Sequence, residues 1–326
     1  MRVTILGAGA WGTALGLQLS RCGHSVCLWG HNSEHLRDME KSRANVRYLP
    51  NISLPQDWIF QPSADLAVRS ADAVVVALPS RAFREGVKVL SDYRGVVVSV
   101  TKGIEYASGL TMCGVLRELL RQAQGVGALS GPSLAMEVAR GIPTAVVAAS
   151  SQPGIAEIIQ TLFTNASFRV YTSSDERGVE MGGALKNVVA IAAGVCDGLG
   201  FGENSKAALI TRGVVEMRRL GVACGAQPDT FSGLGGLGDL TVTCFSKQSR
   251  NRGFGERIGR GESAAEIHAG SVSVAEGYPT SRSAIQLARH HQIPTPIIDE
   301  VYAMLHEAKP PMDAVKALMT RGVKAE

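Results

Sequence analysis

The chain has 326 residues, of which 45% are hydrophobic and 19% charged, with a formal net charge of +4. This length exceeds what one hydrophobic core usually organises, so we expect two domains. The mild charge, the 5% aromatic content and the absence of a basic run argue against nucleic-acid binding. The most apolar segment, residues 182–194, contains a lysine and an asparagine and is expected to be too short to cross a bilayer. We therefore expect a cytoplasmic protein without a membrane span.

The six cysteines form no Cys-x-x-Cys pair, and no two histidines have zinc-ligand spacing. The sequence thus predicts reduced structural thiols and no metal site.

The first predicted element is an apolar strand over residues 3–6, which leads directly into Gly7-x-Gly9-x-x-Gly12 and a helix over residues 13–20. In this order Gly7 permits the tight turn, and Gly9 lets the backbone approach a pyrophosphate. Gly12 allows close packing of helix on strand, and the helix N-terminus faces the phosphate charge. The sequence therefore predicts dinucleotide binding.

Further along, strand and helix patterns alternate. Apolar runs occur at residues 25–29, 73–78, 95–100, 127–129, 144–149 and 168–171, with helical patterns at 83–90 and 110–122. This alternation predicts a Rossmann-type, doubly wound, mostly parallel sheet covered on both faces. From about residue 178 helical patterns dominate, at 179–195, 205–220, 284–290 and 298–307. We expect a dinucleotide-binding domain over 1–177 and an all-helical substrate-binding and catalytic domain over 178–326.

The end of the second strand bears on cofactor choice. NAD-specific Rossmann units usually carry an acidic residue there for the ribose 2′-hydroxyl, whereas this chain has His31 and Asn32. With Arg37, Lys41 and Arg43 downstream, both NADP(H) and NAD(H) are allowed. Alternatively, His31 only caps the following helix.

Two polar segments follow strands of the predicted sheet, where ligands of open α/β sheets gather. Lys102 comes after the strand 95–100, and Ser130-Gly131-Pro-Ser133 comes after 127–129. Lys102 could meet an anionic substrate there or be a solvated loop lysine. The glycine and the hydroxyls could bind a substrate oxygen or simply make a turn.

Lys186 lies in a helical stretch of small and apolar residues, with Asn187 beside it. A lysine buried in such a helix is costly unless it is paired or its pKa falls, which prepares it for proton transfer. A buried ion pair would give the same pattern, and a lysine whose head reaches water is a third possibility.

Two later segments are also informative. Gly233–Gly238 repeats the G-x-G-x-x-G pattern, but no strand precedes it, so a second dinucleotide site is not expected. Asp239 follows and could bond an ammonium or a substrate hydroxyl. Ser249-Arg250-Asn251-Arg252 opens a predicted helix, which suits a phosphate or else forms an exposed basic turn.

Together these segments resemble the bacterial NAD(P)-dependent glycerol-3-phosphate dehydrogenases over essentially the whole length. The matching pieces, in order, are Gly7–Gly12 with Trp11, Tyr48-Leu-Pro50, Thr101-Lys-Gly103, Ser130–Ser133, Leu185-Lys-Asn187, Gly238-Asp-Leu240, Ser249-Arg-Asn251 and Val274-Ala-Glu-Gly277.

The resemblance implies interconversion of dihydroxyacetone phosphate and sn-glycerol 3-phosphate, feeding phospholipid synthesis, with Lys186 as proton donor and acceptor. It implies substrate contacts from Lys102, Gly131, Ser133, Lys186, Asp239, Ser249, Arg250 and Asn251. Cofactor contacts beyond the glycines would come from Trp11, His31, Tyr48, Lys102, Ala135, Arg250, Val274 and Glu276. The apolar helical domain makes a homodimer plausible.

Two other functions share part of this pattern. A β-hydroxyacid or ketopantoate reductase would share the first glycine motif but not the later set. A redox sensor that holds NADP(H) without turnover would have no use for a costly lysine at position 186.

Overall fold

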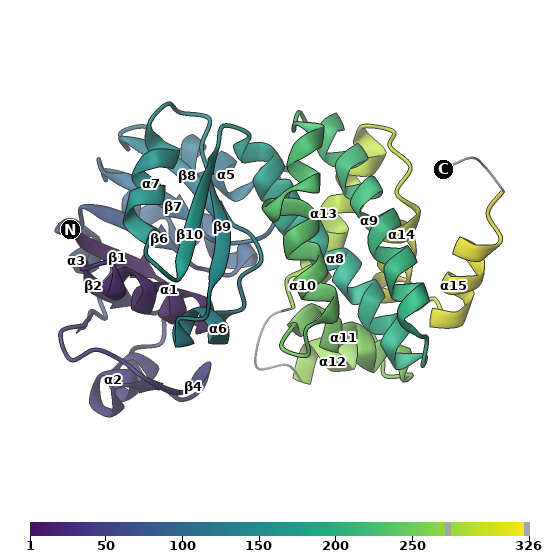
Figure 1. Ribbon diagram of the computed structural model, residues 1–326, viewed down its shortest axis with the longest axis horizontal. Coiled ribbons are helices and arrows are strands. Elements are labelled where there is room, and N and C mark those ends of the chain that lie inside the picture. Colours follow the sequence, from purple (N-terminus) through teal and green to yellow (C-terminus); the bar gives the residue numbers. More distant parts are fainter. Residues whose placement is uncertain (271–274, 323–326) are drawn as a thin grey trace. The chain divides into compact units, whose positions relative to one another are not determined.

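The computed structural model describes residues 1–270 and 275–322 and divides into two compact units (Figure 1). The first unit comprises residues 1–102 and 110–179, and the second comprises 103–109 and the chain from Glu180 onward. The division falls inside helix α8 (Glu176–Gly198), which also contains the boundary expected at residue 177. The segment 103–109 belongs to the second unit, where Ser283 Oγ donates to the carbonyl of Ile104.

The first unit is built on an eight-stranded sheet in the order β10-β9-β8-β7-β6-β1-β2-β5. All neighbouring strands are parallel except β8 and β9. This confirms the predicted doubly wound, mostly parallel sheet. The strands are β1 (Arg2–Leu6), β2 (Ser25–Trp29), β5 (Ile59–Phe60), β6 (Ala73–Val76), β7 (Val96–Ser99), β8 (Gly125–Ser130), β9 (Thr144–Ala149) and β10 (Phe168–Ser173).

Both faces of this sheet are covered. In β6, Ala73 and Val75 belong to one hydrophobic cluster, while Val74 and Val76 belong to another. Helices α1 (Ala10–Arg21), α6 (Ala135–Arg140) and α7 (Ile155–Phe163) supply residues to the first cluster, and α3 (Ala64–Arg69), α4 (Phe83–Gly86) and α5 (Met112–Leu119) supply the second. Because both faces are buried, the strands are continuously apolar rather than alternating.

Some local elements were not expected. A hairpin of β3 (Ala44–Asn45) and β4 (Leu49–Ser53) follows α2 (Ser33–Ser42). The helix predicted over 83–90 is interrupted, so that 3₁₀ turns η1 (Ser80–Ala82) and η2 (Lys88–Leu90) flank α4. Gly86 ends α4, and a Cβ there would lie 2.3 Å from Leu78 Cδ1. Glycine's low helix propensity and this close packing both favour the break.

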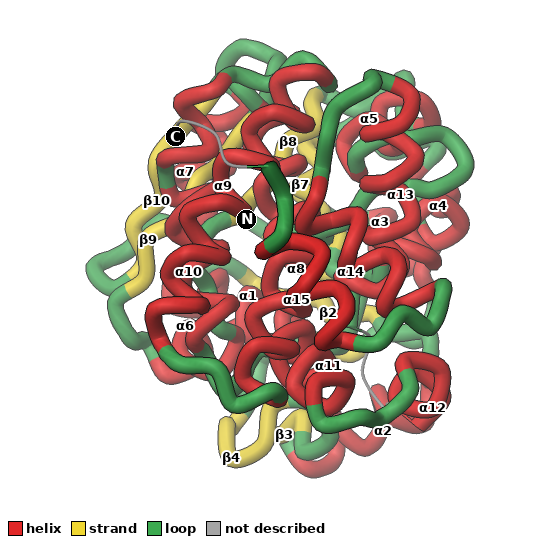
Figure 2. Tube along the Cα trace, turned by 90° about the vertical axis from the view of Figure 1, so that its right-hand side faces the viewer, coloured by secondary structure: helices red, strands yellow, loops and turns green. Residues whose placement is uncertain are grey.

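The second unit is built from helices (Figure 2), as predicted. After α8 they are α9 (Glu203–Ala223), the 3₁₀ turn η3 (Pro228–Ser232), the π-helical turn η4 (Leu234–Gly238), α10 (Asp239–Phe245), α11 (Arg250–Gly259), α12 (Ala264–Gly270), α13 (Gly277–His290), α14 (Pro296–His306) and α15 (Pro311–Met319). No strand precedes Gly233–Gly238, which agrees with its rejection as a dinucleotide loop.

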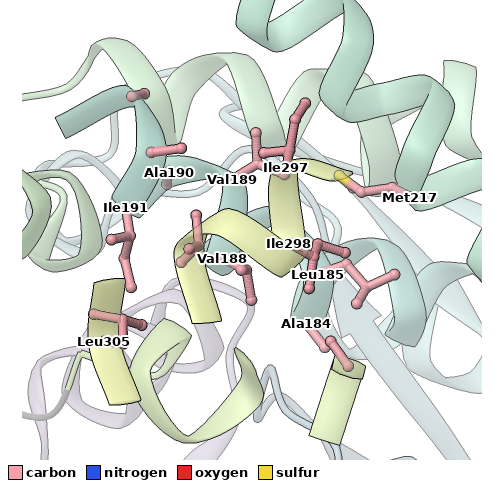
Figure 3. Packing of buried hydrophobic residues seen from close by; sticks show 14 of the residues in the cluster. Ala184, Leu185, Val188, Val189, Ala190, Ile191, Met217, Ile297, Ile298 and Leu305 are labelled. Carbon is pink, nitrogen blue, oxygen red and sulfur yellow. The ribbon is translucent and has the colours of Figure 1, made fainter. Parts of the chain in front are cut away.

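Helix α8 supplies much of the core of this unit. Its side chains Ala184, Leu185, Val188 and Ile191 are fully buried among residues of the other helices (Figure 3). The helix has 23 residues and by length and composition could cross a membrane, so the expectation that this apolar stretch is too short was wrong. However, 94% of its apolar window is buried inside the protein, as in the core helix of a soluble fold.

Glycines let α8 and α11 approach at backbone distance. A Cβ on Gly194 of α8 would lie 1.9 Å from the carbonyl oxygen of Arg252, and a Cβ on Gly255 of α11 would lie 1.9 Å from that of Ile191. Gly182 makes a similar contact with Gly235, since its Cβ would lie 2.4 Å from that carbonyl oxygen. The backbone of the 233–238 segment therefore packs directly against α8 at Gly235.

Substitution of Gly255 by alanine should destabilise the protein by about 3 kcal/mol or more, because its methyl group overlaps the α8 backbone. Gly253→Ala is the matched control on the same helix, since nothing lies within 4 Å of its Cβ position. It should be neutral or slightly stabilising. Urea unfolding of both variants measures the difference, and equal midpoints would contradict backbone contact between α8 and α11.

A buried carboxylate holds the start of α14. Both oxygens of Glu216 in α9 accept hydrogen bonds, from Ile297 N at 2.9 Å and Ile298 N at 2.7 Å. Burial nevertheless raises the pKa of this carboxyl to about 7, from an ordinary value of 4.5. Between these two values the folded protein retains a proton that the unfolded chain has released, so stability falls as the pH rises.

The free energy of unfolding of the wild type, minus that of Glu216→Gln, should therefore fall by on the order of 3 kcal/mol between pH 4.5 and 7. Urea titrations at several pH values measure this difference. Glu203→Gln, an exposed position on the same helix, should show no such trend. A pH-independent difference for Glu216→Gln would refute the raised pKa.

Candidate cofactor and substrate sites

The first glycine loop has the geometry that its sequence predicts. Gly7 has φ +128°, and a Cβ there would lie 2.5 Å from the carbonyl oxygen of Ala77. A Cβ on Gly12 would lie 2.0 Å from the carbonyl oxygen of Gly7. Both positions thus require glycine for the turn and for packing of α1 on the strand, whatever ligand binds.

Gly9 differs from these two glycines because nothing lies within 4 Å of its Cβ position. It is the N-cap of α1 and offers no side-chain cap, so the first N–H groups of α1 depend on another acceptor. Trp11 Nε1, in the same loop, is buried without a hydrogen-bond partner among the described residues. An open cradle at a helix N-terminus fits the pyrophosphate of a dinucleotide.

The polar residues that follow β2 include the cap of helix α2. Asn32, not His31, caps α2, since its side chain accepts from His35 N at 2.9 Å. The alternative that His31 serves as this cap was therefore wrong, and His31 is exposed at the end of the strand. No acidic side chain occupies that end, which leaves room for either form of the cofactor.

Tyr48 lies in the turn of the β3–β4 hairpin, with its ring edge-on to His35 at 5.3 Å between centroids. Asn45 ties this hairpin to the glycine loop, because its amide donates to Ala8 O at 3.1 Å and to Thr13 Oγ1 at 2.8 Å. Sequence reasoning missed Asn45, since a single asparagine in a polar stretch carries no signal of burial.

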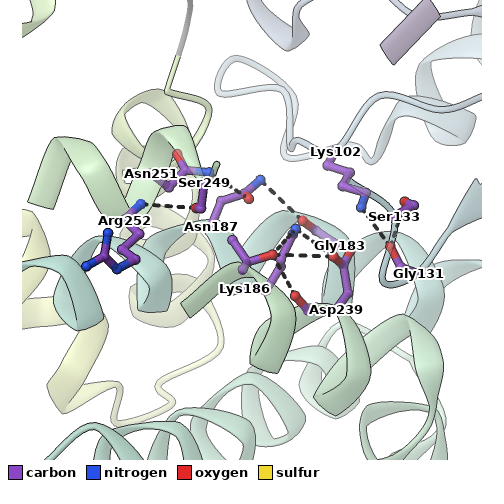
Figure 4. Close-up of polar contacts among 11 residues, drawn as sticks. Lys102, Gly131, Ser133, Gly183, Lys186, Asn187, Asp239, Ser249, Asn251 and Arg252 are labelled. Atoms are coloured by element: carbon purple, nitrogen blue, oxygen red, sulfur yellow. Dashed lines mark hydrogen bonds and ion pairs between the residues drawn. The ribbon is translucent and has the colours of Figure 1, made fainter. Parts of the chain in front are cut away.

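The segments after β7 and β8 meet in the structure. Lys102 Nζ donates to Gly131 O at 3.1 Å, and Ser133 Oγ donates to the same oxygen at 2.9 Å (Figure 4). Gly131 has φ +141°, and its Cβ would lie 3.0 Å from Val146 Cα, so this turn requires glycine. Lys102 is thus a partly buried, hydrogen-bonded lysine rather than a solvated one. Ala135 begins α6 immediately afterwards.

In the second unit, Lys186 is 6% exposed and its ammonium is paired (Figure 4). Nζ donates to Asp239 Oδ1 at 2.7 Å and to Thr243 Oγ1 at 2.6 Å. Thr243 in turn donates to the carbonyl of Asp239 at 2.6 Å. The alternative of a lysine that reaches bulk water is excluded, and the buried ion pair is observed.

Sequence reasoning missed Thr243, although a signal existed. It follows Asp239 by four residues, so once α10 is recognised as a helix both side chains share one face. That face meets Lys186, and the charge is buried with two oxygen partners.

A chain of amides links the starts of two helices to α8. Asn251 Nδ2 donates to Asn187 Oδ1 at 2.8 Å, and Asn251 Oδ1 accepts from Gly277 N at 2.9 Å. Asn187 Nδ2 donates to Gly183 O at 3.3 Å, which completes a consistent set of amide orientations (Figure 4). Asn187 and Asn251 are therefore held in fixed directions near Lys186.

The N-terminus of α11 is capped by Ser249, whose Oγ accepts from Arg252 N at 3.2 Å. Arg250, the first residue of the helix, has exposed surface, but the protein around its guanidinium removes water and lowers its pKa, an effect that the Glu276 carboxylate opposes. Val274, another predicted cofactor contact, lies outside the described residues. A helix N-terminus with an accessible arginine is suited to a phosphate group.

Gly9→Ala tests the cofactor cradle. The added methyl group meets no protein atom and the backbone φ is −83°, so the unfolding midpoint should stay unchanged. Because the methyl group fills the space for a pyrophosphate, the Kd for NADH and NADPH should rise roughly 10-fold or more. Fluorescence titration measures the two dissociation constants. Gly253→Ala is the control, because its Cβ position is equally open, whereas Gly23 has a positive φ that alanine would strain. Unchanged affinity would remove Gly9 from the site.

Comparison with known proteins identifies the family. Residues 2–156 match the N-terminal model, and residues 175–316 the C-terminal model, of NAD-dependent glycerol-3-phosphate dehydrogenase. The chain is 47% identical to the glycerol-3-phosphate dehydrogenase [NAD(P)+] of Chlorobium phaeobacteroides, covering 100% of this chain and 99% of the relative. It is also 47% identical to that of Geobacter sulfurreducens, covering 100% and 98%.

Solved structures agree with this assignment. The glycerol-3-phosphate dehydrogenase of Coxiella burnetii superposes with a TM-score of 0.94 at 38% identity, covering 98% of this chain and 99% of that one. A ketopantoate reductase from Ralstonia eutropha, with a TM-score of 0.59 at 20% identity, shares the fold alone. The chain belongs to the NAD-dependent glycerol-3-phosphate dehydrogenase family.

Proposed function

We propose that this chain interconverts dihydroxyacetone phosphate and sn-glycerol 3-phosphate, with Lys186 as the proton donor and acceptor. As a family member it is an NAD(P)-dependent oxidoreductase. The observation that carries the assignment of Lys186 is its buried ammonium, which bonds Asp239 and Thr243. Such an arrangement fixes the position of a proton at some cost in stability, which suits a catalytic group.

The chemistry follows from the charge that develops on the substrate. When bound, the reduced nicotinamide supplies the hydride. As a ketone is reduced, negative charge grows on its oxygen, and the Lys186 ammonium stabilises that charge and donates the proton. In the reverse direction the neutral amine accepts the hydroxyl proton. Asp239 favours the ammonium form by its charge, and Thr243 fixes the direction of Nζ.

The substrate phosphate is proposed to bind at the start of α11, where Ser249, Arg250 and Asn251 lie together. Arg250 brings a guanidinium fork, and the first N–H groups of the helix add positive potential. Phosphate binding far from the reacting carbon provides energy for orienting that carbon. In the first unit, Lys102, Gly131 and Ser133 are proposed to complete the substrate contacts.

The dinucleotide is proposed to bind the glycine loop and its surroundings, as NADP(H) or NAD(H). Support comes from the open cradle at Gly9 and the lack of an acidic side chain after β2. The proposed contacts are Gly7, Gly9, Trp11, Gly12, His31, Tyr48, Lys102, Ala135, Arg250, Val274 and Glu276. The two domains would thus divide the work, with cofactor bound mainly by residues 1–177 and catalysis carried out by residues 178–326.

The proposed cellular role is to supply glycerol 3-phosphate for phospholipid synthesis in the cytoplasm, with the protein acting as a homodimer. The product has the glycerol phosphate backbone that phospholipids need. Sedimentation of the purified protein measures the proposed self-association directly.

The decisive experiment follows NADH and NADPH oxidation with dihydroxyacetone phosphate, using 2-keto acids as controls for the reductases that share the fold. Lys186→Ala should lower turnover about 1,000-fold or more, because the proton donor is lost, and should leave the Kd of the cofactor nearly unchanged. Substantial residual turnover would contradict the assignment of Lys186.

A double variant separates catalysis from ion pairing. Lys186→Met combined with Asp239→Asn removes both buried charges, so stability lost in Lys186→Ala should be regained. Turnover should remain absent, because no acid replaces the ammonium. Recovery of turnover in the double variant would show that Lys186 serves only as the structural partner of Asp239.

A further inference from the structure

Behind the start of α11 lies a buried group of charges that the mechanism above does not use. Asp197 Oδ1 is 2.6 Å from Lys206 Nζ, and Asp197 Oδ2 is 2.6 Å from Arg252 Nε. We name these three residues the Asp197 triad. They come from α8, α9 and α11, and the side chains of Asp197, Lys206 and Arg252 are 14%, 7% and 11% exposed.

The triad is an expensive way to gain stability. One carboxylate serves two cations, each largely removed from water, and Glu256 adds only a longer contact of 3.2 Å to Arg252 Nη1. Burying ions costs several kcal/mol each, so hydrophobic side chains of similar size would often stabilise such a site equally well. What the ions supply instead is position, because each oxygen of Asp197 lies 2.6 Å from one cation. The contact between Asp197 Oδ2 and Arg252 Nε is an ion pair without hydrogen-bond geometry.

The direction given to Arg252 bears on the proposed phosphate site. Arg252 lies in the first turn of α11, and its backbone N–H is the group that Ser249 caps. It follows Arg250 by two residues, so the two side chains leave the helix about 200° apart around its axis. Anchoring Arg252 to Asp197 of α8 therefore turns Arg250 to the opposite, exposed side.

The glycine contacts set both how closely α8 and α11 approach and which face of α11 meets α8. A Cβ on Gly194 or on Gly255 would lie 1.9 Å from the facing carbonyl oxygen, so only the glycine faces of the two helices can meet. These contacts act on the backbone. The Asp197 triad and the bond from Asn251 to Asn187 add two side-chain contacts that hold the first turn of α11.

We propose that the Asp197 triad is a positioning element that orients the Ser249–Asn251 turn for the substrate phosphate. This inference rests on the proposed function, since it assumes that the phosphate binds at that turn. Asp197, Lys206 and Arg252 are positioning residues, which act through Arg250 and Asn251 without touching the substrate.

Asp197→Asn tests this proposal, because it keeps the shape of the side chain and removes the charge that holds Arg252. The KM for dihydroxyacetone phosphate should rise about 10-fold or more, with kcat reduced less than the KM is raised and the cofactor Kd unchanged. With unphosphorylated dihydroxyacetone at high concentration, kcat/KM should equal that of the wild type. An unchanged KM for dihydroxyacetone phosphate, or equal losses with both substrates, would overturn the proposal.

Loss of stability alone is controlled by Glu216→Ala. Like Asp197→Asn, this variant removes a carboxylate of the second unit that has two partners. The backbone N–H groups of Ile297 and Ile298 lose their acceptor. It should lower the unfolding midpoint and leave the KM unchanged. A KM rise in Glu216→Ala equal to that in Asp197→Asn would reduce the triad to a stabilising role.

Two further variants keep the test decisive. In Asp197→Asn with Lys206→Met, stability should recover while the KM stays high, because Arg252 still lacks its carboxylate. If Asp197→Asn does not fold, Arg252→Lys replaces it, since it retains the charge and loses the planar guanidinium, and the same KM rise is expected. Normal KM values in either variant would overturn the proposal. Absence of dihydroxyacetone phosphate reduction in the wild type would instead refute the proposed function.

Discussion

Burial of the Lys186 ammonium is the constraint that organises the helical unit. A buried ammonium needs hydrogen-bond acceptors to remain charged. Lys186 finds them in Asp239 and Thr243, which lie on another helix. Both come from α10, whose position depends on the turn η4 that packs against Gly182 of α8. The glycine-rich segment before Asp239 is thus the packing surface that lets the acid reach its partner.

The same helix also fixes the remaining polar groups of this unit. Asn187 follows Lys186, and its side-chain oxygen accepts a hydrogen bond from the amide nitrogen of Asn251 in α11. The amide oxygen of Asn251 accepts from the backbone N–H of Gly277, the first residue of α13. A contact between a Gly277 Cβ and Asn187 O would measure only 2.5 Å, so α13 also begins at backbone distance from α8. Three helices therefore start or pass within reach of one turn of α8, which is why small residues dominate its sequence.

The sequence allowed prediction of features that depend on local pattern. The glycine loop, the mostly parallel sheet and the buried lysine can each be predicted from residues that are close together in the chain. Thr243 was within reach of the same reasoning, because it lies one helical turn after Asp239. Asn45 and Asp197 were not, because their importance arises from partners that only the folded chain brings near, such as Ala8 and Arg252. Local pattern can also mislead: one interpretation of the sequence assigned the cap of α2 to His31, whereas its neighbour Asn32 forms that cap.

The two G-x-G-x-x-G segments show why a motif needs its physical context. In the first, Gly9 has open space around its Cβ position at the start of a twelve-residue helix. In the second, the counterpart of Gly9 is Gly235, and a Cβ on Gly182 of α8 would lie 2.4 Å from its carbonyl oxygen, so this segment is packed against a helix. Open space alone does not indicate a ligand, because Gly253 is equally open, whereas at Gly9 the space coincides with a helix N-terminus that has no side-chain cap. A backbone atom close to the Cβ position shows instead that packing of the chain requires glycine there, as at Gly7 and Gly12.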